Sequence, residues 1–216
     1  AVAAAGPQPY AFSQASLFSG PELRRLQADY QEIRRSCATR LAVLFRTEFE
    51  LSLASLQTPS FRQFAGAVAQ PAHLTMFKAE PLRGIGVLEI SPALALALSD
   101  RLMGGPGDAN LPVRELTEIE MALLDQVAHL SIETWCAHWT SLRELKPSLL
   151  GHESDGRYLQ TSPADSSMLL ARFEAKVGEA TGHVALALPF NTIEPILQKL
   201  RAELQPPAEA TASTPA

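Results

Sequence analysis

Leu102-Met103-Gly104-Gly105-Pro106-Gly107-Asp108 separates two helical patterns near the middle of the chain. Three glycines and one proline in four positions cannot continue a helix, because glycine is too free and proline lacks an amide proton. The stretch therefore predicts a tight, exposed loop with a bare backbone. It is either a helix-ending turn or a loop on which a partner or ligand docks. A phosphate loop is disfavoured, since no Gly-Lys-Ser/Thr follows and no apolar strand precedes it.

Helices with recognisable starts lie on both sides of this loop. Ser19-Gly20-Pro21-Glu22 and Thr117-Glu118-Ile119-Glu120 have the spacing of a capping box, in which a hydroxyl and a carboxylate bind the first free amides. Apolar residues at spacings of three and four predict that these helices reach about Phe45 and Leu142. Ser91-Pro92 is expected to start the helix that ends at the glycines.

Alternating apolar and polar residues predict strands between the helices. A short helix carrying Phe61 and Phe64 is expected to begin at Thr58-Pro59. Because short turns join neighbouring strands, we expect mainly antiparallel pairing. The expected strands are Phe49 to Leu53, His73 to Ala79, Ile85 to Ile90, Leu145 to His152, Met168 to Val177 and Gly182 to Leu188, and a last helix covers Asn191 to Leu200.

The chain contains two similar segments, residues 20–104 and 115–200. Phe77-Lys78-Ala79-Glu80 in the first and Phe173-Glu174-Ala175-Lys176 in the second are each followed by a turn, a glycine, a strand and a helix. Each half thus has the order helix, strand, strand, strand, helix. We expect an α/β (α+β) fold with pseudo-two-fold symmetry, a mainly antiparallel sheet and long outer helices. The glycine loop lies where the halves join.

The composition argues against several functional classes. The 216 residues carry a net charge of −5 with acids and bases interspersed, so nothing suggests nucleic-acid binding. No apolar run reaches the about 20 residues of a membrane span. Two cysteines are no disulfide framework and fit a reducing, cytoplasmic setting. Small residues and prolines predict a flexible tail at residues 1–9 and a flexible linker at 204–216, so one domain covers residues 10–203.

Several conspicuous side chains have ordinary structural interpretations. Cys37 lies on the apolar stripe of the first helix, which indicates a buried, unreactive thiol. Trp135 and Trp139 are one helical turn apart and are expected in the core. His129 and Cys136 are too far apart on one helix for a shared zinc ion, so no metal or cofactor is expected. Four arginines indicate either a solvated helix face or a partner contact: Arg24, Arg25, Arg34 and Arg35.

Taken together, these motifs resemble the middle domain of the flagellar motor switch family FliM, within the CheC/CheX/FliY fold group. The similarity covers Tyr10 to Leu200. Its most specific parts are Asp100 to Gly107 and Leu116 to Glu120. The other segments that carry it are Tyr10-Ala11-Phe12 with Phe18-Ser19, Glu80 to Gly84, Leu88 to Pro92, Phe173 to Gly178 and Pro189 to Leu197.

The resemblance implies a non-enzymatic scaffold of the cytoplasmic C ring, peripheral to the inner membrane at the flagellar basal body. It implies that Gly104, Gly105, Pro106 and Gly107 contact the rotor protein FliG. Arg101 and Asp108 flank these residues and are weaker candidates for polar contacts. A Gly105→Asp change is then expected to weaken binding and leave the fold intact.

The resemblance also implies further partners. FliM copies stand side by side in a ring and relay binding of phospho-CheY into clockwise or counter-clockwise rotation. The family binds phospho-CheY mainly through an amino-terminal peptide, and FliN through a carboxy-terminal domain. We recognise neither segment in this sequence, so direct binding of both partners is expected to depend on segments outside it.

A CheC-like module that binds or dephosphorylates a response regulator is the alternative. The phosphatases of this fold carry a glutamate followed three residues later by an asparagine, which together orient the attacking water. Here Glu118 and Glu120 are followed at that spacing by Met121 and Leu123. Since the pair is absent from both halves, we predict no enzyme. A type III secretion scaffold of related architecture is a third possibility.

Overall fold

The computed structural model describes residues 17–109 and 111–204. They form a mixed fold of helices and one six-stranded antiparallel sheet, which confirms the predicted fold class. The elements are, in chain order, α1 (Gly20–Phe45), β1 (Phe49–Gln57), α2 (Phe61–Ala67), β2 (His73–Glu80), β3 (Gly86–Ile90), α3 (Pro92–Leu102), α4 (Glu118–His138), η1 (Trp139–Ser141), β4 (Lys146–Glu153), η2 (Gly156–Tyr158), β5 (Met168–Val177), β6 (Ala180–Pro189) and α5 (Phe190–Leu204).

The strand order of the sheet has pseudo-two-fold symmetry. The sheet runs β1-β5-β6-β3-β2-β4, and exchanging β1, β2 and β3 with β4, β5 and β6 reverses this order onto itself. The pseudo-axis therefore passes between β6 and β3. The first strand of each half pairs with the second strand of the other half, as β1 with β5 and β4 with β2. The two halves are interlaced and share one sheet.

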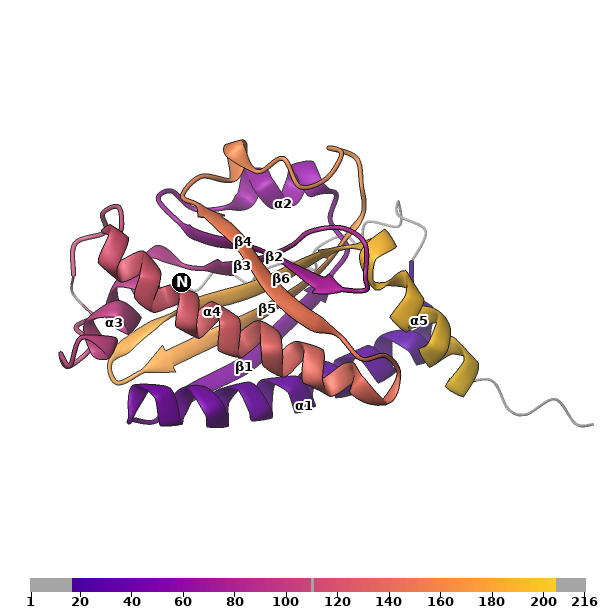
Figure 1. The fold of residues 1–216 in the computed structure, drawn as a ribbon, viewed down its shortest axis with the longest axis horizontal. Helices are drawn as coiled ribbons and strands as arrows, with labels where there is room; N and C mark the ends of the chain where they lie inside the picture. Colours follow the sequence, from indigo (N-terminus) through magenta and orange to yellow (C-terminus); the bar gives the residue numbers. More distant parts are fainter. Residues whose placement is uncertain (1–16, 110, 205–216) are drawn as a thin grey trace, which may run out of the picture.

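The sheet has a large core on one face and a smaller core on the other. Leu186 and Leu188 of β6 point into the large core, which also takes side chains from α1, α3, α4 and α5. Ala185 and Ala187 alternate with them and face the smaller core under α2. Figure 1 shows the long helices α1 and α4 side by side, with α2 lying beyond the strands from α1.

The helix starts follow the predicted capping chemistry, with one correction. Capping boxes are formed at Ser19 of α1 and Thr117 of α4. The short helix α2 has its own capping box at Ser60, so the predicted start at Thr58-Pro59 was wrong. Ser91 precedes α3, but its hydroxyl accepts the amide proton of His183 on β6 instead of capping the helix.

The longest helix ends earlier than its apolar pattern predicts. α4 stops at His138, and a 3-10 turn over Trp139–Ser141 replaces the last predicted turn. The carbonyl of Trp139 accepts the amides of Leu142 and Arg143. This tightening turns the chain back toward β4, because helices commonly close with 3-10 bonds where the direction changes.

Some strand and helix limits also differ from the sequence pattern. β1 continues to Gln57 instead of Leu53, through a register shift between Leu53 and Ser55 that keeps it paired with β5. α5 extends to Leu204, one residue into the predicted linker. The predicted tail at residues 1–9 and the remaining linker residues lie outside the described residues.

The core explains most of the conspicuous side chains. Cys37, Trp135 and Trp139 are buried, as predicted. Burial raises the pKa of the Cys37 thiol to about 11. The arginine prediction holds only in part, because half-buried Arg34 donates to the carbonyl oxygen of Leu51 at 2.7 Å. This bond ties α1 to β1, an edge strand of the sheet.

Candidate functional site: the glycine loop

The glycine loop, residues 103–108, begins as a regular helix terminus. Gly104 has a left-handed φ of 94° after the last turn of α3. The Gly105 amide donates to the Asp100 carbonyl at 2.9 Å, and the Gly104 amide donates to the Arg101 carbonyl at 3.1 Å. These two bonds form a Schellman motif, in which only glycine adopts the left-handed position without strain. The helix-ending interpretation is therefore correct for Gly104.

The carboxylate of Asp100 holds the second part of the loop. Its Oδ2 accepts the amide proton of Gly107 at 2.8 Å. Gly107 is buried and has a left-handed φ of 76°. A Cβ atom on Gly105 would lie 2.4 Å from either carboxylate oxygen of Asp100. A side chain at position 105 would therefore push the Asp100 carboxylate aside, whereas the expectation that Gly105→Asp leaves the overall fold intact stays a prediction.

Arg101 connects the loop to the end of α1. Its Nη1 donates to the carbonyl of Gly105 at 3.2 Å. Its Nε donates to the carbonyl of Phe45 at 3.2 Å, and its Nη2 donates to the carbonyl of Arg46 at 3.4 Å. The guanidinium is thus engaged by three carbonyls of its own chain.

The exposed part of the loop is mainly apolar. Met103 is 55% exposed, and Gly104, Pro106 and Asp108 are also exposed. The turn between β5 and β6 lies next to the loop. A Cβ atom built on Gly178 of this turn would be 3.9 Å from the Pro106 carbonyl oxygen. Met103 and Pro106 are therefore exposed to a partner, while the β5–β6 turn packs against the loop backbone.

The structure divides the six candidate residues by role. Gly104, Pro106 and Asp108 are accessible to a partner, whereas half-buried Gly105 and buried Gly107 shape the backbone. Arg101, the sixth, holds the loop to the end of α1. Met103 and Asp100 are functional candidates that sequence reasoning missed. An apolar residue directly before two glycines was a usable signal for Met103. No local signal marks Asp100, because its role depends on an amide seven residues later.

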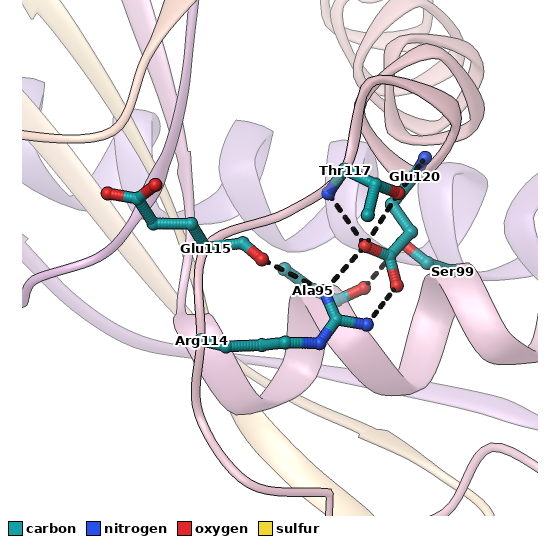
Figure 2. Close-up of polar contacts among 6 residues, drawn as sticks. All are labelled: Ala95, Ser99, Arg114, Glu115, Thr117 and Glu120. Atoms are coloured by element: carbon teal, nitrogen blue, oxygen red, sulfur yellow. Dashed lines mark hydrogen bonds and ion pairs between the residues drawn. The ribbon is translucent and has the colours of Figure 1, made fainter.

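An ion pair between Arg114 and Glu120 holds the segment that enters α4 (Figure 2). Arg114 donates from Nη1 and Nη2 to the two carboxylate oxygens of Glu120, at 2.8 and 2.7 Å. Glu120 also completes the capping box with Thr117. The Arg114 and Thr117 hydrogen bonds lower the pKa of Glu120 to about 2. Glu120 therefore stays ionised at neutral pH.

The described residues offer little for catalysis or metal binding. Burial raises the pKa of the Cys136 thiol to about 12, so both cysteines are protonated at neutral pH. Burial, aided by His152, lowers the pKa of His73 to about 4, which leaves a neutral ring. Within residues 17–109 and 111–204, no cluster of metal-ligating side chains is present. No helix of this part is long and apolar enough to cross a bilayer.

The fold and the loop together define the middle-domain class of flagellar switch proteins. A crystal structure of the FliM middle domain from H. pylori superimposes with a TM-score of 0.77 at 25% identity, covering 84% of this chain and 99% of that one. The FliG-FliM complex from H. pylori gives a TM-score of 0.79 at 26% identity, with 84% and 100% covered. FliY of Thermotoga maritima shares the fold at a TM-score of 0.70 and 15% identity, covering 88% of this chain and 100% of that one.

The sequence comparison names the family. The family model described as "Flagellar motor switch protein FliM" matches residues 19–204, and the chain belongs to this family. FliM of Treponema pallidum is 30% identical over 194 residues, which cover 90% of this chain and 56% of that protein. FliM of Bacillus subtilis is 25% identical, with 88% and 58% covered. The chain thus spans about half the length of the curated relatives it matches.

Proposed function

We propose that this chain is a flagellar motor switch subunit that docks on FliG through the glycine loop. The exposed, preformed loop at residues 103–108 carries the proposal. A loop already held by Asp100 and Arg101 loses little conformational freedom on binding, which favours affinity. The H. pylori relative at 26% identity was crystallised as a FliG-FliM complex, which supports the same partner for this chain.

The remaining assignments follow family membership and are part of the proposal. The chain works as a non-enzymatic scaffold in the cytoplasmic C ring, peripheral to the inner membrane at the basal body, beside further copies of itself. It relays phospho-CheY binding into the direction of rotation. Phospho-CheY binding belongs mainly to an amino-terminal peptide of the family, and FliN binding belongs to a carboxy-terminal domain of the family. The absence of the Glu-Asn pair favours this role over a CheC-like phosphatase.

Isothermal titration of the chain against FliG tests the docking site. A Met103→Glu variant is expected to weaken binding about tenfold or more, because losing one of the few residues that dominate an interface costs about 2 kcal/mol or more, which exceeds the about 1.4 kcal/mol of a tenfold change. Tyr158→Glu is the matched control. Tyr158 is 64% exposed on η2, which packs against α2 away from the loop.

Two results would contradict the proposal. One is equal weakening by both variants, and the other is a wild-type chain that does not bind FliG while it binds a phosphorylated response regulator. Cooperative thermal melting of each variant shows that the fold is intact. Gly105 is avoided because its substitution displaces Asp100.

A further inference from the structure

The three hydrogen bonds of Arg101 join two elements that are far apart in sequence. α1 ends at Phe45, and Arg46 caps it with a left-handed φ of 52°. The carbonyls of Phe45 and Arg46 belong to the helix terminus, where no later amide of the helix is available as a donor. Arg101 supplies donors to both carbonyls and to Gly105 in the glycine loop.

We propose that Arg101 is a positioning residue that couples the C-terminal end of α1 to the glycine loop. Its planar, forked guanidinium holds both sides at once, which a single ammonium group does not reproduce. When the end of α1 moves, Gly105 moves with it. The effect on FliG binding rests on the proposed function, whereas the coupling itself is a property of this chain alone.

Contacts between α1 and α4 provide an input to this coupling. Arg40 of α1 donates to Thr134 at 2.8 Å and to Glu133 at 2.5 Å on α4. Near the other end, Asp29 lies 3.1 Å from Nε2 of His138. Through these contacts, a displacement of α4 is expected to move α1 as well. Arg101 extends this path to the loop, so the loop senses the packing between the two halves.

The test is residue-resolved amide exchange in the full 216-residue chain. Arg46→Pro disturbs the end of α1, because proline has no amide to donate to Ala42 and Val43 and does not reach a φ of 52°. In the wild-type background, exchange of the Gly105 and Gly107 amides is expected to rise about tenfold. In an Arg101→Ala background, the exchange of these amides is expected to be raised already. Adding Arg46→Pro is then expected to raise it by less than about twofold.

Two controls and one replacement variant make the result specific. Arg46→Gly keeps the left-handed cap and is expected to leave loop exchange unchanged. Arg101→Lys keeps the charge and is expected to behave like Arg101→Ala. If Arg46→Pro does not fold cooperatively, Arg46→Val replaces it, because a β-branched residue disfavours this φ.

The coupling would be overturned if Arg46→Pro raised loop amide exchange by the same factor with and without Arg101→Ala. It would also be overturned if Arg46→Pro acted in the Arg101→Lys background as it does in the wild type. The exchange readout needs no partner. A chain that shows coupled exchange without binding FliG therefore contradicts only the docking proposal. A chain that binds FliG through Met103 with independent exchange effects contradicts only the role of Arg101.

Discussion

At the scale of single residues, the glycine loop owes its shape to one aspartate and two left-handed glycines. Asp100 binds the loop twice, with its carbonyl on the Gly105 amide and its carboxylate on the Gly107 amide. Gly104 and Gly107 take the φ values that other residues avoid. The loop is therefore an ordered extension of α3, and its glycines serve the backbone more than the partner surface.

A Gly107→Ala substitution is expected to destabilise the chain by about 1–2 kcal/mol, because alanine is strained at a φ of 76°. Its Cβ would also lie 3.5 Å from the Ala97 carbonyl, which adds little to the effect. Urea denaturation measures the difference. Gly66→Ala is the control, since Gly66 lies in α2 with open space around it. Alanine is expected to stabilise that helix, and equal destabilisation at both sites would refute the special role of Gly107.

A Glu120→Gln substitution is expected to cost about 1–2 kcal/mol at neutral pH, because it breaks a two-bond charged pair whose arginine is half exposed. The pKa of Glu120 falls from 4.5 to about 2 in the folded chain. Its stabilisation is therefore complete above pH 4.5 and is lost as the pH falls toward 2.

Urea denaturation at neutral pH and near the folded pKa checks this prediction. The wild type and the Glu120→Gln variant are expected to converge in stability at the acidic end. Glu118→Gln is the matched control, because Glu118 is exposed in the same first turn of α4. A Glu118 variant that loses as much stability as the Glu120 variant would assign the effect to helix charge alone.

At the scale of elements, buried His73 at the start of β2 is expected to make the sheet sensitive to mild acid. His73 of β2 stacks with His152 of β4, with ring centroids 5.8 Å apart. Its Nε2 lies 3.1 Å from the Thr75 hydroxyl. Because the folded pKa of about 4 lies below the ordinary 6.5, the unfolded chain binds the proton first. Stability is then expected to decline as the pH falls from 6.5 to 4.

A His73→Gln variant is expected to have a flatter stability profile than the wild type between pH 6.5 and 4. Denaturant midpoints measured across this range provide the comparison. His129→Gln is the control, since His129 is exposed on α4 and its loss is expected to leave the slope unchanged. An unchanged slope in the His73 variant would show that other groups cause the acid sensitivity.

The elements also show what local sequence can predict. Capping boxes and apolar stripes located α1 and α4 because those signals act within one turn of helix. The continuation of β1 beyond Leu53 had no local signal, since it depends on pairing with β5 across a register shift. The Thr58-Pro59 pair is a competing start signal just before Ser60, which is why the sequence predicts the start of α2 two residues too early.

At the scale of the whole molecule, the interlaced halves place the glycine loop beside elements from both. The loop follows α3 of the first half, lies against the β5–β6 turn of the second, and is tied by Arg101 to α1. The internal repeat predicted the symmetry of the sheet, and the glycines predicted the position of the loop. The hydrogen bonds of Asp100 and Arg101 to the loop were not predictable, because they form only in the folded chain.

Chemical-shift mapping of the isotope-labelled chain with unlabelled FliG would locate the docking surface residue by residue. We expect the largest perturbations at the amides of Met103, Gly104, Gly105 and Gly107. Smaller changes are expected at Arg46 and Gly178, which adjoin the loop, and none around Tyr158. Perturbations centred on α2 and η2, with an unchanged loop, would contradict docking through the glycine loop.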